Sequence, residues 1–529
     1  MSEPRTLPPN YMVVPPFLNM ATLAVDRHVE AGKGGAPAIL DGERTITYAE
    51  LQRLLNRWGN ALKDLGFKKG DHFIIRAANC LEYYVAVLGG MKIGAVPIPT
   101  NTLFRSKELR HIITNSESIA VISTPELVGP IDEVRRACPS LRHTIILGAP
   151  KAGQLSFSDL LEAGSERLEA ARTSKDDLAF SLYTSGTTGD PKGVQHAHRW
   201  LIGSGDPICH FAMDLRPSDI CFQPQEISFM YPFGNNFFYP LYSGACIVMY
   251  AGRFEPERTL AYIQRYRVTI FSAVPTIYRM LLAIADAEKR YDLSSVRLGN
   301  SAGEPLPQDT YEEVKRRFGF ETMDGIGQTE LHIFLSNYPG LKVKPGAMGK
   351  PMLGHTVAVL NDKGEECPAG EVGELCLRAD DPGLTLGYRK MEDRWQAVNK
   401  AGWYYCKDYA YRDEDGYYWY VSRSDDIIVT RAYLVSPKEV EEAIMDHPAV
   451  LEAGVVGLPD PTIGQKIKAF ITLKPSVAPS GALAEEIKAM LKEKIAPYKA
   501  PREIEFVSEL PKTATGKILR RMLRQEQQA

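Results

Sequence analysis

Residues Tyr183 to Val194 read Tyr-Thr-Ser-Gly-Thr-Thr-Gly-Asp-Pro-Lys-Gly-Val, a composition suited to binding phosphate. Glycines let the backbone turn tightly and present its N–H groups, hydroxyls add donors, and a lysine adds positive charge. The spacing is not that of the Walker P-loop. We therefore predict a polyphosphate site of another kind and rank a plain Gly/Ser/Thr-rich surface turn below it. The candidate ligands are Thr184, Ser185, Gly186, Thr187, Thr188, Gly189 and Lys192.

The bulk composition narrows the class of protein. A chain of 529 residues is too long for one hydrophobic core, so two or more domains are expected. A net charge of −3 argues against nucleic acid as a partner. We also expect no membrane span and no secretion signal. The eight cysteines are scattered without a Cys-x-x-Cys pair, which favours reduced thiols and a cytoplasmic location and gives no zinc site.

Strand-like and helix-like stretches alternate through the first half of the chain. Thr47 and Glu50 form a capping box before a helix that Gly66 ends. Further helices are predicted at 82–93 and 106–115, and strands at 73–75, 94–99, 119–123, 245–250 and 268–272. This alternation indicates α/β layers built on parallel sheets.

The pattern changes toward the C-terminus. Gly-rich turns and short Val, Leu and Tyr runs from 349 to 420 indicate a β-rich subdomain. A boundary is predicted at 424/425, which gives domains 1–424 and 425–529. Ser436 and Glu439 then cap a helix through Met445, and strands at 453–456, 468–473 and 503–507 with a helix at 483–494 complete a small α+β domain.

Five further motifs follow the glycine loop in a fixed order. They are Ser301-Ala-Gly-Glu-Pro305, Asp324-Gly-Ile-Gly-Gln-Thr-Glu330, Gly402-Trp403 followed by Asp408, Arg423-x-Asp425-Asp426, and Thr515-Gly-Lys517. In this order the six motifs resemble the adenylate-forming superfamily, which includes acyl- and aryl-CoA synthetases, luciferases and nonribosomal adenylation domains. The resemblance covers nearly the whole chain. It implies a large N-terminal domain of two α/β sheet subdomains plus a β-barrel-like one, followed by a small mobile C-terminal domain.

The resemblance assigns expected roles residue by residue. The loop from Thr184 to Lys192 would hold the β- and γ-phosphates of ATP. Thr329 would contact the α-phosphate, and Glu330 would hold Mg²⁺, a hard cation that takes oxygen ligands. A single acidic or basic residue is usually a partner in a surface salt bridge, so these roles depend on the order of the motifs. Gly303, Glu304, Asp324 and Gly325 would border adenine, Asp408 would bind the ribose hydroxyls, and Arg423 would contact the nucleotide.

The resemblance also implies two half-reactions. Lys517 is the expected catalytic lysine of adenylation, where it offsets negative charge as a carboxylate attacks the α-phosphate. The thiol of CoA, a co-substrate, then attacks the acyl-AMP. Asp425 occupies the hinge position about which the C-terminal domain would rotate between the steps.

Within the superfamily the chain most resembles benzoate-CoA ligases and their aryl relatives. The resemblance lies in Phe229-Met-Tyr-Pro-Phe-Gly-Asn-Asn236, Asn300-Ser-Ala-Gly-Glu-Pro-Leu-Pro307 and His332-Ile-Phe-Leu-Ser-Asn337. The expected substrates are a small carboxylic acid, ATP and CoA, with the enzyme a monomer or homodimer. His332 is either a pocket residue or a packed histidine. The candidates to line the acyl pocket are Met230, Tyr231, Gly327, His332 and Ile333.

The chain departs from the family pattern at several positions. Ala432 before Tyr433, at the expected CoA tunnel, replaces a glycine that lets pantetheine approach the backbone. Cys406-Lys407 replaces Thr-Gly, and Ser422 replaces a glycine. The replacement at Ala432 leaves a carrier-protein thiol open as the acceptor. Among substrates, aryl acids rank first and medium-chain or alicyclic acids second. A binding protein that has lost catalysis is disfavoured because the key polar residues are present.

Overall fold

The computed structural model describes residues 7–184, 191–424, 426–430, 433–460, 464–475, 477–512 and 518–525. The chain forms two compact units. The first unit comprises Met1–Thr356 and Leu377–Tyr404, and the second comprises Val357–Cys376 and Tyr405–Ala529. The predicted boundary at 424/425 stays a prediction.

A nine-stranded sheet forms the centre of the first unit, in the order β16-β15-β14-β13-β12-β10-β11-β1-β2. Its inner pairs are parallel, and β2, β15 and β16 add antiparallel edges. The strands are β1 (Pro37–Asp41), β2 (Arg44–Thr47), β10 (Ile220–Phe222), β11 (Cys246–Val248), β12 (Ile270–Ala273), β13 (Leu298–Ala302), β14 (Thr322–Gln328), β15 (His332–Ser336) and β16 (Lys350–Pro351).

Two smaller sheets also belong to this unit. The all-parallel sheet β4-β3-β5-β6-β7 is made of β3 (His72–Arg76), β4 (Val96–Pro99), β5 (Ala120–Ser123), β6 (His143–Ile146) and β7 (Leu155–Ser156). The antiparallel sheet β19-β9-β8 is made of β8 (Leu178–Thr184), β9 (Lys192–Ala197) and β19 (Gly387–Tyr388).

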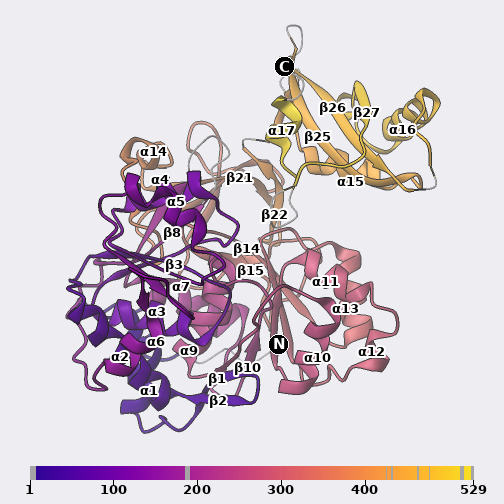
Figure 1. Cartoon of the computed structure of the whole chain (residues 1–529). Coiled ribbons are helices and arrows are strands. Elements are labelled where there is room, and N and C mark those ends of the chain that lie inside the picture. The colour runs from indigo at the N-terminus through magenta and orange to yellow at the C-terminus, as the bar shows by residue number, and fades with distance from the viewer. Residues whose placement is uncertain are drawn as a thin grey trace. The chain divides into compact units, whose positions relative to one another are not determined.

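Helices cover these sheets, and Figure 1 shows α10 to α13 gathered beside the nine-stranded sheet. They are α1 (Arg27–Glu30), α2 (Tyr48–Asp64), α3 (Leu81–Lys92), α4 (Ser106–Ser116), α5 (Gly129–Val134), α6 (Phe157–Ala163), α7 (Trp200–Pro207), α8 (Met230–Phe233), α9 (Tyr239–Ser243), α10 (Pro256–Tyr266), α11 (Pro275–Leu282), α12 (Ala287–Arg290), α13 (Gln308–Phe318) and α14 (Glu392–Gln396). Short π- and 3₁₀-helical turns are η1 (Thr22–Asp26), η2 (Arg135–Ala137), η3 (Ile208–Ala212) and η4 (Gly234–Phe238). In the described part of the chain, every helix is too short or too polar to cross a membrane.

The predicted α/β alternation is confirmed. The capping box at the start of α2 is present: the Glu50 backbone N–H donates to Thr47 Oγ1 at 3.2 Å, and the Thr47 N–H donates to a Glu50 carboxylate oxygen at 2.8 Å. Gly66, just past the helix, adopts φ +85°, which a residue with a Cβ rarely tolerates. Local signals therefore set both ends of this helix.

The second unit contains a β-rich part and a small α+β part. The first holds β17 (Val357–Leu360), most of β18 (Gly373–Arg378), most of β21 (Trp403–Arg412) and β22 (Tyr418–Arg423), and β20 (Asn399–Lys400) pairs with the start of β21. The second holds the sheet β24-β23-β26-β25 with β27 on β26, made of β23 (Ile428–Thr430), β24 (Tyr433–Val435), β25 (Val450–Asp460), β26 (Gly464–Leu473) and β27 (Glu503–Phe506). Its helices are α15 (Pro437–Met445), α16 (Gly481–Lys494), α17 (Arg520–Gln525) and the 3₁₀ turn η5 (Pro497–Lys499).

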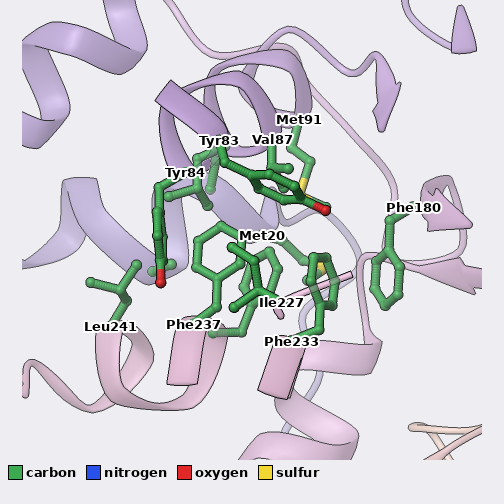
Figure 2. Packing of buried hydrophobic residues seen from close by; sticks show 14 of the residues in the cluster. Met20, Tyr83, Tyr84, Val87, Met91, Phe180, Ile227, Phe233, Phe237 and Leu241 are labelled. Atoms are coloured by element: carbon green, nitrogen blue, oxygen red, sulfur yellow. The ribbon is translucent and has the colours of Figure 1, made fainter. Parts of the chain in front are cut away.

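The main core of the first unit contains a cluster of aromatic rings among its aliphatic side chains. Figure 2 shows Tyr83 and Tyr84 of α3 facing Phe233 of α8 and Phe237 of η4, with Met20 between them. The rings of Tyr84 and Phe237 meet edge to face with centroids 4.7 Å apart. This contact joins helices that lie about 150 residues apart in the chain and so ties the two large sheets of the unit together.

A charged network lies inside this core. Lys92, with 3% of its side chain exposed, contacts Asp26 of η1 at 2.7 Å and donates to Asn56 Oδ1 of α2 at 2.6 Å. Gln52 also donates to Asp26, at 2.8 Å. Because a buried charge is tolerated only when it is paired, this network fixes three helices against one another.

We predict that Lys92→Met lowers the free energy of unfolding by about 3–5 kcal/mol, because it leaves the Asp26 carboxylate buried without its cation. Urea unfolding followed by tryptophan fluorescence measures the loss. The double variant Asp26→Leu/Lys92→Met is the matched control and recovers part of it, since neither charge then remains buried. The role would be contradicted if the double variant lost as much unfolding free energy as Asp26→Leu and Lys92→Met lose together.

Candidate active site

The two ends of the glycine loop lie side by side. Strands β8 and β9 pair antiparallel, and their last register pair joins Thr184 to Lys192. The hydroxyl of Thr184 is buried and has no hydrogen-bond partner among the described residues. The five predicted ligands between them, Ser185, Gly186, Thr187, Thr188 and Gly189, lie outside the described residues. The hairpin therefore presents one hydroxyl and one lysine at the mouth of the loop.

Lys192 meets Glu330, the predicted metal ligand. Lys192 Nζ lies 2.7 Å from Glu330 Oε1, and the Tyr388 hydroxyl donates to the same oxygen at 2.7 Å. Lys192 Nζ also lies 3.2 Å from the Tyr388 oxygen and 4.3 Å from the centroid of its ring. The carboxylate is buried with 6% of its side chain exposed, whereas 23% of the Lys192 side chain is exposed. The structure thus joins the glycine loop to the Thr-Glu motif.

Glu330 is ionised in this arrangement. Burial by itself would raise the pKa of Glu330, but the Lys192 ammonium and the hydrogen bonds from Lys192 and Tyr388 outweigh it and hold that pKa below its ordinary value. Burial and the Glu330 charge raise the pKa of Tyr388, so its phenol stays protonated and donates. The site therefore holds a carboxylate able to bind a cation.

The backbone around Thr329 and Glu330 is held from two sides. His196 Nε2 of β9 lies 2.8 Å from the Thr329 carbonyl oxygen, and the Thr385 N–H donates to the Glu330 carbonyl oxygen at 2.8 Å. Burial lowers the pKa of His196 to about 3, so the imidazole is neutral and donates through Nε2. Thr329 itself is half-buried and lies in the turn just after β14.

The four predicted adenine-border residues come from neighbouring strand ends. Strands β13 and β14 are parallel, with Ser301 opposite Asp324 and Ala302 opposite Gly325. Asp324 Oδ2 accepts from the Leu306 N–H at 3.2 Å. Gly303 follows β13 with φ +90° and is exposed, and Glu304 accepts from the Thr276 hydroxyl at 2.9 Å. The carboxyl ends of parallel strands are a common ligand-binding edge.

The predicted acyl-pocket residues also lie together. Strand β15 folds back on β14, so that Gly327 faces Ile333 and Gln328 faces His332. A Cβ on Gly327 would lie 2.4 Å from the His332 carbonyl oxygen, so this close approach requires glycine. Tyr231 donates its hydroxyl to Asn300 Oδ1 at 2.9 Å, and its carbonyl oxygen lies 3.3 Å from His332 Nε2. Met230 precedes it in α8 and is buried.

His332 is packed rather than charged. Its ring lies 4.9 Å from Tyr239, edge to face, and 6.2 Å from both Tyr231 and Trp200. Burial lowers its pKa to about 3, so it is neutral. Its φ of +118° lies in a region that L residues rarely adopt. The surroundings of His332 are therefore aromatic and uncharged.

Two predicted nucleotide ligands belong to the second unit. Asp408 of β21 pairs with Arg423 of β22, and Asp408 Oδ1 lies 3.5 Å from Arg423 Nη1. Asp408 is buried and Arg423 is 43% exposed. Lys407 adopts φ +59°, the left-handed conformation, where the family resemblance leads one to expect glycine.

Several predicted residues cannot be placed in this way. Lys517, Asp425 and Ala432 lie outside the described residues, and for Tyr433 the structure describes only the backbone, opposite Thr430 in β23. Conversely, the sequence analysis missed Tyr388 and His196. A histidine four residues after Lys192 was a usable signal, whereas nothing near Tyr388 marked it as a partner of Glu330.

Comparisons with known proteins identify the family of the chain. The AMP-binding enzyme family matches residues 25–389, and the AMP-binding enzyme C-terminal domain matches residues 439–517. The benzoate–CoA ligase of Thauera aromatica is 38% identical over 519 residues, covering 98% of this chain and 97% of that protein.

Solved structures give the same picture. An anthranilate CoA ligase in complex with anthranoyl-AMP matches with a TM-score of 0.88 at 36% identity, over 97% of this chain and 98% of that one. A benzoate CoA ligase from Burkholderia xenovorans LB400 matches with a TM-score of 0.85 at 34% identity, over 96% of this chain and 100% of that one. The predicted fold class and the resemblance to adenylate-forming enzymes of the benzoate-CoA ligase type are confirmed. The chain belongs to the family of AMP-binding enzymes and is an AMP-forming acid–CoA ligase.

Proposed function

We propose that this ligase activates an aryl carboxylic acid as acyl-AMP and passes the acyl group to CoA. The observation that carries the proposal is the tight hairpin between β14 and β15. Its turn bears Thr329 and Glu330, and its second strand begins with His332 among aromatic rings. One hairpin thus joins the proposed phosphate side to the proposed acid side, where an acid carboxylate and an α-phosphate must meet.

The chemistry of the acid side supports an uncharged aromatic ring. Neutral His332 offers no positive charge to a carboxylate, and Trp200, Tyr231 and Tyr239 around it favour stacking with a flat ring. The relatives named above act on benzoate and anthranilate, which are such acids. A positive charge for the reacting carboxylate must come from elsewhere, and we assign it to Lys517.

The proposed metal site fits Mg²⁺. Among the described residues no three His, Cys, Asp or Glu side chains gather as a metal cage. Mg²⁺ is usually held by one or two carboxylates together with substrate phosphates, and ionised Glu330 beside the glycine loop supplies one. When bound, Mg²⁺ would neutralise phosphate charge. Thr184, Ser185, Gly186, Thr187, Thr188, Gly189 and Lys192 would hold the phosphates.

The remaining assignments complete the nucleotide site. We propose that Gly303, Glu304, Asp324 and Gly325 border adenine, that Asp408 binds the ribose hydroxyls, and that Arg423 contacts the nucleotide. Thr329 contacts the α-phosphate. We further propose that the C-terminal domain turns about Asp425 between the half-reactions and that CoA passes Ala432 and Tyr433.

The substrate class is tested with a panel of acids scored by CoA-dependent AMP release. Benzoate and aminobenzoates should exceed hexanoate and octanoate in kcat/KM by about tenfold or more, equivalent to about 1.4 kcal/mol of transition-state binding. Cyclohexanecarboxylate is the matched control, since it has the size of benzoate without the flat ring. Preference for octanoate, or equal use of cyclohexanecarboxylate and benzoate, would contradict an aryl pocket.

Lys517→Ala should separate the two half-reactions. Loss of its charge should lower acid-dependent pyrophosphate exchange by about 10²–10³-fold, because the adenylation transition state loses its counter-charge. Thioester formation from supplied acyl-AMP should persist. Lys494→Ala is the control, because Lys494 is 44% exposed and pairs with Asp446 on the surface. An equal loss in both assays would refute the role.

Asp425→Pro should give the opposite separation. Proline fixes φ and would hinder a backbone rotation there, so pyrophosphate exchange should persist while thioester formation slows by about tenfold or more. Stopped-flow measurement of both steps checks this. Asp425→Ala, which removes the carboxylate but leaves the backbone free, should retain the second step better than the proline variant. Equal effects of the proline and alanine substitutions on the second step would contradict the hinge role of Asp425.

A further inference from the structure

The two-residue strand β19 connects the glycine loop to Glu330. Gly387 and Tyr388 pair with Gln195 and Val194 of β9, and the Arg389 N–H donates to the Gly193 carbonyl oxygen at 2.8 Å. These bonds run along β9 almost to Lys192, the first residue of that strand. Two residues before β19, the Thr385 N–H bonds the Glu330 backbone. The segment is therefore hydrogen-bonded to the backbone of Glu330 and to that of Gly193, the residue that follows Lys192.

The Tyr388 side chain makes the same connection a second time. Its hydroxyl donates to Glu330 Oε1 at 2.7 Å, while its ring lies under the Lys192 ammonium. The ring is buried and meets the Trp395 ring edge to face at 5.4 Å. Backbone pairing, burial and this aromatic contact all fix the position of the phenol.

Lys192 is held differently. It extends on a four-carbon stem from the end of the glycine loop and is partly exposed, so it can turn from a carboxylate to a phosphate. When it turns, Glu330 loses its ammonium partner and would be left buried with an unpaired charge. The Tyr388 hydroxyl does not depend on Lys192 for its position and remains bonded to the carboxylate.

We propose that Tyr388 is a positioning residue for the metal–nucleotide complex: its hydroxyl holds the Glu330 carboxylate in place while Lys192 exchanges that carboxylate for the nucleotide phosphates. The inference rests on the proposed function, in which Glu330 binds Mg²⁺ and Lys192 binds phosphate. Outer partners of this kind set the orientation of a metal ligand and with it the affinity for the metal.

The test compares wild type with Tyr388→Phe, which removes the hydroxyl and keeps the ring. The Mg²⁺ concentration for half-maximal pyrophosphate exchange should rise about tenfold, with the KM for the acid unchanged. Calorimetric titration with a non-hydrolysable ATP analogue gives a readout without turnover. Mg²⁺ increases the affinity for the analogue, and this increase should be about tenfold smaller in the variant. The affinity for the analogue in the presence of a chelator should stay at the wild-type value.

Tyr266→Phe is the matched control. Tyr266 belongs to the same unit, and its hydroxyl donates to the Gly42 carbonyl oxygen at 3.0 Å rather than to Glu330. It should leave the Mg²⁺ midpoint at the wild-type value. The variant Glu330→Gln and the double variant with Tyr388→Phe should share one midpoint, because the tyrosine acts through the carboxylate.

Two results would overturn the inference. One is a Tyr388→Phe enzyme whose Tm falls while its Mg²⁺ midpoint does not move, which would make the tyrosine purely structural. The other is a double variant that is about tenfold worse than Glu330→Gln alone. Wild-type enzyme that shows no exchange with any acid would instead refute the proposed function, and the calorimetric comparison would still decide the role of Tyr388.

Discussion

The site depends on one buried carboxylate. An ionised group in the interior is costly unless it is paired and hydrogen-bonded, and Glu330 is both, through Lys192 and Tyr388. The cost explains why three separate segments converge there: the strand after the glycine loop, the β14–β15 hairpin and the short strand β19. In the proposed function, a magnesium ion would replace the lysine as the cation that faces this carboxylate.

The hairpin that carries Glu330 also brings the proposed acid side close to the proposed phosphate side. The close approach of Gly327 to the His332 backbone and the strained φ of His332 make the turn tight. As a result, a two-residue step along the chain separates the carboxylate from the aromatic surroundings of His332. A reaction between a carboxylate and a phosphate needs such proximity more than it needs any single strong contact.

Features with local signals were predictable from the sequence. The N-terminal caps of α2 and α15 are each formed by residues within a single four-residue segment of the chain. Both helices begin where the sequence predicts. The roles of Thr329 and Glu330 could be proposed because a motif surrounds them. Tyr388 could not, because its contact with Glu330 spans 58 residues and that with Lys192 spans 196. Pairing over such distances depends on the whole fold and leaves no periodicity. Lys407 shows a related limit. Its backbone adopts the left-handed conformation, but a lysine in the sequence does not predict that conformation as a glycine would.

The central claim is that an oxygen of the acid becomes bonded to the α-phosphorus of ATP. It is tested most directly with benzoate labelled with ¹⁸O in its carboxyl group, incubated with wild-type enzyme, Mg²⁺, ATP and CoA. The account predicts AMP that carries one labelled oxygen, since the oxygen that attacks phosphorus stays with AMP when the thiol takes the acyl group. Unlabelled AMP, or label recovered in orthophosphate alongside ADP, would contradict it.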